Sequence, residues 1–141
     1  MRQAKQLGID AVYVASCAAF ASPDYWKIAG SAAENAYYAT TVFELSDEES
    51  ATNRSMLKKA FLAKYGKTPG VLVCMPYESL RIISQCLETI PEVSTDEIRA
   101  YLLGIKNFDS SVGILASDAD GDIEVDMILM RVRNQKAEQV K

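Results

Sequence analysis

Residues 11–16 read AVYVAS and residues 36–43 read AYYATTVF, and these two apolar stretches decide the fold class. The first is short and rich in Val and Tyr, which is typical of a parallel strand covered on both faces. The second is β-branched and aromatic, which favours a second strand. A helical segment precedes each stretch, so the sequence predicts an α/β protein with a parallel sheet.

Helix signals flank both predicted strands. The segment RQAKQLGI at residues 2–9 is typical of the end of a helix, because Gly8 stands where a left-handed capping residue is needed. The tripeptide Ser22-Pro23-Asp24 predicts a helix start capped by Ser22, and this helix is expected to run to about Ala33.

The middle of the chain is predicted to be helical. An acidic segment at residues 44–50 opens a long helix through a capping box, Ser46 with Glu49, and Gly66 ends it. A second helix is predicted to begin near Pro76, and a third follows Ser94. The second helix is expected to turn one face inward: Tyr77, Leu80, Ile83, Ser84 and Leu87.

The last third of the chain changes to extended segments. SVGILAS at residues 111–117 and IEVDMILMRV at residues 123–132 flank DADGD, which predicts a β-hairpin. The acidic turn suggests calcium, but its order differs from an EF-hand loop, and a solvated turn is the preferred interpretation. The polar segment 134–141 is expected to be frayed. Two strands and a distant hairpin make a thin sheet, so further strands are expected outside this sequence.

The composition excludes several function classes. The chain has no histidine, which removes the commonest general base and metal ligand near neutral pH and with it Ser-His-Asp, Cys-His and HExxH sites. Cys17, Cys74 and Cys86 are far apart without a CxxC pair, and we interpret them as small buried residues. Catalysis by carboxylates or Lys stays open on composition alone. We expect a protein that is not an enzyme, with no catalytic residue, no metal and no cofactor.

Charge and hydropathy limit the classes of partner that we expect. The net charge is −4 and the basic residues are scattered, which argues against nucleic acid and anionic membrane surfaces. No apolar run approaches the roughly 20 residues of a membrane helix. The opening MRQAKQLGID lacks the apolar core of a secretory signal, so we expect no signal peptide in this chain.

Five segments occur in an order that resembles a known family. They are QAKQLGI (3–9), IAGSAAENAYYAT (28–40), FLAKYGKTPG (61–70), YESL (77–80) and FDSSVGILASDADGD (108–122). Together they resemble the C-terminal part of type I periplasmic solute-binding proteins, in particular the Leu/Ile/Val-binding protein family of ABC transporters.

The resemblance implies an α/β fold of two Rossmann-like, three-layer αβα lobes that close over a small solute at a hinge. Residues 1–43 would belong to the second lobe, residues 44–107 would return to the first, and residues 108–141 would form a β-hairpin crossing back. More than half of such a protein would be absent, so this fragment would have incomplete sheets.

Candidate ligand contacts come from two places. In an open α/β sheet the binding cleft lies beyond the carboxyl ends of the strands. The loop after the first strand lies there, where small side chains let the backbone approach a ligand and Phe20 offers an apolar wall; a small-residue turn packed under a helix is the alternative. This loop comprises Ser16, Cys17, Ala18, Ala19 and Phe20.

By resemblance, the segment from Cys74 to Tyr77 lies at the cleft from the other lobe and supplies apolar contacts, although Tyr77 also fits a core position at helical spacing. Amino-acid-binding relatives commonly carry a carboxylate in the loop after the first strand, where this chain has Ala18 or its neighbours. An amide, a carboxylate or an aromatic acid is therefore as reasonable a ligand as an amino acid.

Three functional hypotheses follow. The first is a solute-binding component of an ABC importer, whose parent protein is periplasmic or extracytoplasmic and whose partners are a small solute and a membrane permease. The second is a cytoplasmic ligand sensor on the same fold. The third is a homodimer-forming fragment without ligand binding, because exposed strand edges attract partners.

Overall fold

The computed structural model describes residues 1–15, 20–44 and 52–141. The chain divides into two compact units. Unit 1 comprises Met1–Leu45 with Met127–Lys141, and unit 2 comprises Ser46–Asp126. The segments expected from the resemblance have boundaries at residues 44 and 108, and the division into units falls after residues 45 and 126.

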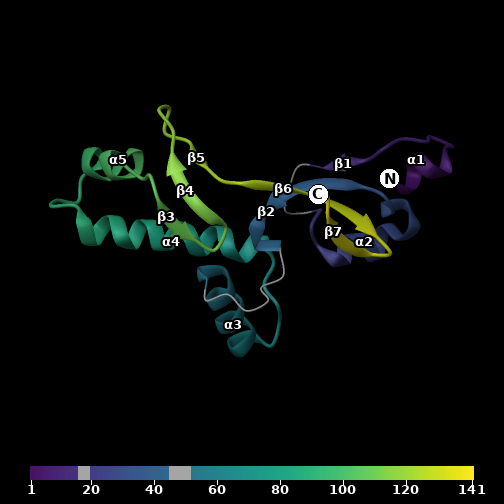
Figure 1. The fold of residues 1–141 in the computed structure, drawn as a ribbon, viewed down its shortest axis with the longest axis horizontal. Coiled ribbons are helices and arrows are strands. Elements are labelled where there is room, and N and C mark those ends of the chain that lie inside the picture. Colours follow the sequence, from purple (N-terminus) through teal and green to yellow (C-terminus); the bar gives the residue numbers. More distant parts are fainter. Residues whose placement is uncertain (16–19, 45–51) are drawn as a thin grey trace. The chain divides into compact units, whose positions relative to one another are not determined.

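Unit 1 combines a mixed sheet with short helices (Figure 1). Its elements are α1 (Arg2–Gln6), β1 (Val14–Ala15), α2 (Pro23–Ala29), the 3-10 helix η1 (Gly30–Ala33), β2 (Tyr37–Thr41), the 3-10 helix η2 (Val42–Glu44), β6 (Met127–Arg133) and β7 (Lys136–Gln139). The helix, strand, helix, strand order predicted for the first third is therefore present. Gly8 has a φ of 73°, as predicted for the residue that follows the first helix.

The sheet of unit 1 has the order β1-β2-β6-β7. β1 and β2 run parallel, with Val14 opposite Tyr37, and the other neighbours are antiparallel. The first strand was expected to be covered on both faces, but Val12 and Val14 are 73% and 75% exposed. Because β1 pairs with β2 alone, its other edge has no strand beside it among the described residues.

The core of unit 1 is aromatic. Tyr38 is fully buried, and its ring centroid lies 5.6 Å from Phe20 and 6.0 Å from Trp26. Met130 and Val132 of β6 pack into the same cluster. Alternate residues of β2 and β6 thus face the helical side of the sheet, as the two-residue period of strands requires.

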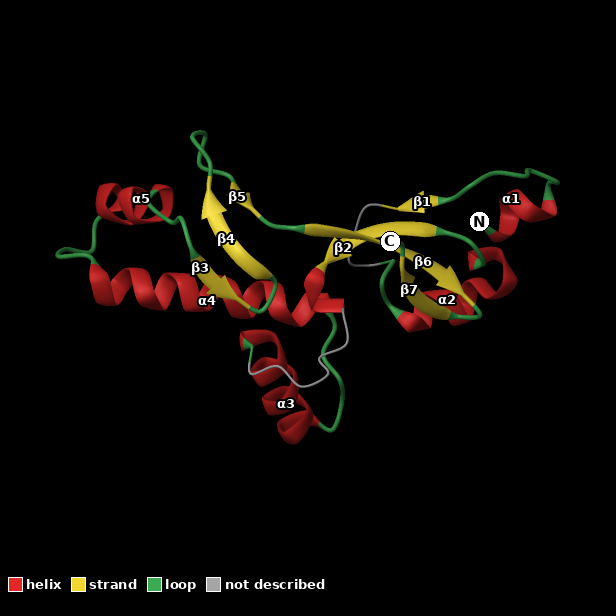
Figure 2. Ribbon diagram, in the orientation of Figure 1, coloured by secondary structure: helices red, strands yellow, loops and turns green. Residues whose placement is uncertain are grey.

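The C-terminal segment, which was expected to be frayed, forms a paired strand. β7 lies beside β6 (Figure 2) and pairs with it antiparallel, with Arg133 opposite Lys136. Asn134 and Gln135 join the two strands with φ values of 49° and 58°. Two left-handed residues form the type of tight turn that matches the strand twist, which explains why a polar sequence continues the sheet.

Unit 2 contains three helices and a small antiparallel sheet. Its elements are α3 (Asn53–Tyr65), α4 (Val71–Thr89), α5 (Thr95–Leu103), β3 (Phe108–Ser110), β4 (Gly113–Ser117) and β5 (Ile123–Glu124). β4 and β5 form a hairpin around the acidic turn, as predicted. The rest of the second predicted extended segment instead becomes β6, which pairs with β2 in unit 1.

The caps of unit 2 agree with the sequence in part. The Ser94 hydroxyl accepts a hydrogen bond from the Glu97 N–H at 3.3 Å, and Gly66 ends α3 with a φ of 66°. Thr52 caps α3 by accepting from the Ser55 N–H at 3.2 Å. The predicted capping box of Ser46 with Glu49 lies outside the described residues.

Helix α4 begins earlier than predicted and buries another face. Its first residue is Val71, and Pro76 lies inside it. The side chains expected to point inward are exposed: Tyr77, Leu80, Ile83, Ser84 and Leu87. The residues that are buried instead are Val71, Cys74, Glu78, Ile82 and Cys86. The prediction was wrong about α4 within this chain because the helix is apolar on more than one side, and periodicity alone does not say which side has a partner.

Candidate functional site

The predicted contact residues fall in different parts of the structure. Ser16, Cys17 and Ala18 lie outside the described residues. Phe20 belongs to unit 1, and Cys74 and Tyr77 belong to unit 2. Each unit is therefore considered by itself.

In unit 1, Phe20 follows the loop that leaves β1. Its ring is 7% exposed and packs against Tyr25, with ring centroids 5.1 Å apart. Its carbonyl accepts a hydrogen bond of 2.6 Å from Nε1 of Trp26. These contacts hold Phe20 against α2 and leave little of its side chain for a ligand.

In unit 2, the two predicted residues differ in exposure. Cys74 is fully buried, and its thiol donates to the carbonyl of Val71 at 3.0 Å. Tyr77, three positions further along α4, is 41% exposed. Of this pair, the tyrosine has the surface that a solute needs.

An ion pair with a buried carboxylate lies next to Tyr77 on α4. Glu78 is 3% exposed, and its carboxylate accepts from Arg81 at 2.8 Å and from the Ser111 N–H at 2.9 Å. Arg81 also donates to the carbonyl of Asp109 at 3.2 Å, and its guanidinium lies 6.0 Å from the Tyr77 ring centroid. These bonds tie α4 to the turn between β3 and β4 and hold a cation beside the tyrosine.

Sequence reasoning missed both Glu78 and the first turn of α4. The acidic residue followed three positions later by Arg81 was the available signal for a helical ion pair. Because α4 begins at Val71 and not near Pro76, Leu72 lies in its first turn. The Leu72 side chain is 67% exposed there. This apolar side chain, like that of Met75, is available for contact.

The acidic turn between β4 and β5 is held together by its own hydrogen bonds. One carboxylate oxygen of Asp118 accepts from the N–H groups of Asp120, Gly121 and Asp122 at 2.8–2.9 Å. These bonds, led by that of Asp122, lower the pKa of Asp118. Across residues 1–15, 20–44 and 52–141, no group of three or more acidic or cysteine side chains is arranged to hold a metal ion.

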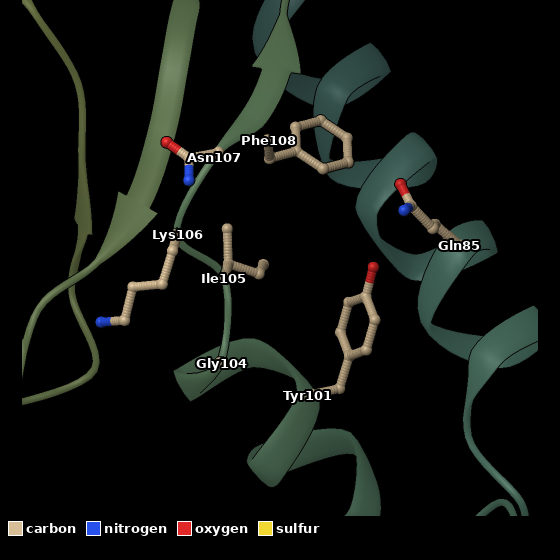
Figure 3. A pocket seen from close by; sticks show the side chains of 7 residues that line it. All are labelled: Gln85, Tyr101, Gly104, Ile105, Lys106, Asn107 and Phe108. Atoms are coloured by element: carbon tan, nitrogen blue, oxygen red, sulfur yellow. The ribbon is translucent and has the colours of Figure 1, made fainter.

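A hollow of about 320 Å³ lies within unit 2 between α4, α5 and the segment that leads into β3 (Figure 3). We call it the α4–α5 pocket. It is lined by Gln85, Tyr101, Gly104, Ile105, Lys106, Asn107 and Phe108. The lining is mainly apolar and neutral, and it contains no paired nucleophile and base.

No helix in the described part of the chain combines the length and apolarity needed to cross a membrane. No family model matches the sequence, and no curated protein matches it either. Solved structures do match.

Three solved structures illustrate the similarity. A leucine-binding protein, LivK, from Thermotoga maritima is 23% identical with a TM-score of 0.80, and the match covers 99% of this chain and 39% of that one. LivJ of Streptococcus pneumoniae, a branched-chain amino acid transporter substrate-binding protein in complex with isoleucine, is 26% identical with a TM-score of 0.75, covering 99% and 40%. An extracellular ligand-binding receptor from Rhodopseudomonas palustris is 22% identical with a TM-score of 0.79, covering 99% and 43%.

The fraction of each protein that the match covers is as informative as the TM-score. Nearly every element of this chain has a counterpart in those proteins, yet the chain spans only about 40% of the length of the first two. The thin sheet of unit 1 and its open β1 edge agree with a part of a larger architecture. The chain therefore has the type I periplasmic binding-protein fold, as a fragment of it with incomplete sheets.

Proposed function

We propose that this chain is part of the solute-binding component of an ABC importer, and that it takes part in ligand capture without covalent chemistry. The observation that carries the proposal is the match over 99% of the chain to an isoleucine-bound substrate-binding protein at 26% identity. Its other neighbours include leucine-binding and extracellular ligand-binding proteins. The periplasmic or extracytoplasmic setting and the membrane permease partner belong to this proposal.

Binding in such a component works as a population shift. A solute that contacts both lobes favours the closed form by its differential affinity for closed over open, and the permease recognises that form. The residues involved need only shape and hydrogen bonds, which agrees with a chain that has no histidine.

The contacts proposed in unit 2 are Tyr77 and Leu72. Both are exposed on the first half of α4, and Tyr77 combines a ring with a hydroxyl group that can donate or accept. Cys74 is proposed to act through packing, since its side chain is fully buried. The loop of Ser16, Cys17 and Ala18 is proposed as the contact in unit 1.

The ligand class remains wider than amino acids. Ala18 or its neighbours stand where amino-acid-binding relatives commonly carry a carboxylate that pairs with the ligand ammonium. A small amide, a carboxylate or an aromatic acid is therefore proposed beside the branched-chain amino acids.

The test is thermal unfolding of the 141-residue chain with branched-chain amino acids, small amides and aromatic acids. A ligand that binds only the folded state stabilises it by about 2.7 kcal/mol at one hundred times its Kd. We expect a rise in Tm for one class and its loss in Tyr77→Ala. Tyr65→Ala on α3 is the matched control, because Tyr65 is also exposed and aromatic. No rise for any class would contradict ligand binding by this chain.

A second candidate is self-association. Val14 of β1 and the preceding Val12 are exposed, and among the described residues β1 has a neighbouring strand on one side only. Leu80 and Ile83 are exposed on α4. Such surfaces favour a homodimer. Light scattering decides between the two: a monomer with a ligand-dependent Tm supports the first candidate, and a dimer without one supports the second.

A further inference from the structure

The α4–α5 pocket has a wall that is already fixed in place. Ser117 donates its N–H to the carbonyl of Ile105 at 2.8 Å and its hydroxyl to the carbonyl of Leu102. Lys106 in turn donates its ammonium to the carbonyl of Ser117 at 2.8 Å. One residue of β4 thus anchors the segment between α5 and β3, so a ligand would not have to order it on binding.

The lining combines an apolar wall with two neutral polar groups. Ile105 and Phe108 are buried and form the wall. Figure 3 shows the Tyr101 ring rising from α5 into the hollow and the Gln85 carboxamide entering it from α4. Phenol and carboxamide groups together offer both donors and acceptors to a ligand.

No ionised side chain of the lining points into the pocket; outside the lining, the Arg81 guanidinium lies 5.1 Å from the Phe108 ring centroid. Lys106 is the charged residue in the lining, and Figure 3 shows its side chain directed away from the other liners, where its ammonium is bound to Ser117. Burial, and secondarily the nearby Cys86, raise the pKa of Tyr101 above 10.0. Tyr101 therefore keeps its proton at neutral pH and acts as a hydrogen-bond donor.

We propose that the α4–α5 pocket is a binding site for a small, planar, uncharged molecule that carries a carboxamide group. The ring of the ligand lies against Ile105 and Phe108, and its amide exchanges hydrogen bonds with Tyr101 and Gln85. A volume of about 320 Å³ is at the lower end of the range of ligand sites, which fits a single-ring compound.

This site is separate from the contacts proposed for the transported solute. Tyr77 and Gln85 are eight positions apart on α4 (85 − 77 = 8), which corresponds to roughly 12 Å along a helix that rises 1.5 Å per residue. All of the lining residues belong to unit 2. The inference therefore does not depend on the proposed transport role.

The test is a titration of the full 141-residue chain with benzamide, followed by two-dimensional NMR of backbone and side-chain amides. We expect saturable shifts at Gly104, Asn107 and the Gln85 carboxamide, and weaker binding of benzoate, because the ammonium of Lys106 is held by the carbonyl of Ser117 and not directed at the ligand. Tyr101→Phe is expected to lower the affinity for benzamide about five-fold, which is the usual net contribution of one neutral hydrogen bond.

A blocking variant completes the design. Gln85→Trp fills the hollow from an exposed helical position and is expected to abolish the shifts, whereas Leu87→Trp on the same helix, outside the lining, is expected to leave them unchanged. Circular dichroism establishes that each variant is folded. Absence of saturable shifts in the folded parent chain, or equal benzamide affinity in folded parent and Gln85→Trp proteins, would overturn the proposal.

Discussion

Replacing Glu78 by alanine is expected to destabilise unit 2 substantially. The carboxylate is buried and accepts from Arg81 at 2.8 Å and from the Ser111 N–H at 2.9 Å, so its removal leaves a backbone donor and a cation without their partner. Breaking a buried pair costs about 3–5 kcal/mol, but the Arg81 side chain is 32% exposed and regains water. We therefore expect a loss of about 2–3 kcal/mol in the free energy of unfolding.

The measurement is urea unfolding followed by far-ultraviolet circular dichroism, with hydrogen exchange at the Ser111 amide. Glu78→Gln retains an acceptor for the Ser111 N–H and is expected to cost about 1 kcal/mol. Lys27→Ala is the control, because it removes an exposed i,i+3 ion pair with Asp24 and is expected to cost less than about 0.5 kcal/mol. If Glu78→Ala were no more destabilising than Lys27→Ala, or if Ser111 exchange were unchanged, the reasoning would be refuted.

Three further outcomes are expected. Trp26→Phe removes the hydrogen bond to the Phe20 carbonyl and leaves a gap in the core of unit 1, which lowers the free energy of unfolding by about 2 kcal/mol in thermal melts. Gly66→Ala places a Cβ in open space but at a φ of 66°, so it costs about 1 kcal/mol in urea unfolding. The lowered pKa of Asp118 means that its contribution to stability is present above pH 3.8 and is lost as the pH falls through the folded-state pKa. Asp118→Asn is therefore expected to flatten the acid limb of a stability–pH curve, and an unchanged limb would contradict this assignment.

Local signals predicted much of the fold. Gly8, Gly66 and Ser94 were placed correctly because a left-handed cap or a capping hydroxyl depends on a few neighbouring residues. The hairpin around the acidic turn was also confirmed. The errors came where a longer-range partner decides the outcome: the last predicted extended segment divides between two sheets, and Asn134 and Gln135 return the tail to the sheet of unit 1.

The candidate site was less predictable than the fold. The resemblance placed Tyr77 at the binding cleft, which stays a prediction, and it did not indicate the ion pair between the buried Glu78 and Arg81. A buried carboxylate follows from tertiary contacts with the turn at Ser111, which hydrophobic periodicity does not contain. The α4–α5 pocket was missed for the same reason, since its liners come from three separate segments.

The two apolar sides of α4 connect the fold to the length of the chain. One side packs within unit 2 through Cys74, Ile82 and Cys86, and the other side, with Leu80 and Ile83, is exposed. A helix that is apolar on opposite sides is normally buried between two layers. Solved structures of this fold contain more than twice the polypeptide that this chain supplies, since the match covers 39% of LivK. The sequence pattern of α4 thus describes a helix with a layer on each side, and the described residues provide one of those layers.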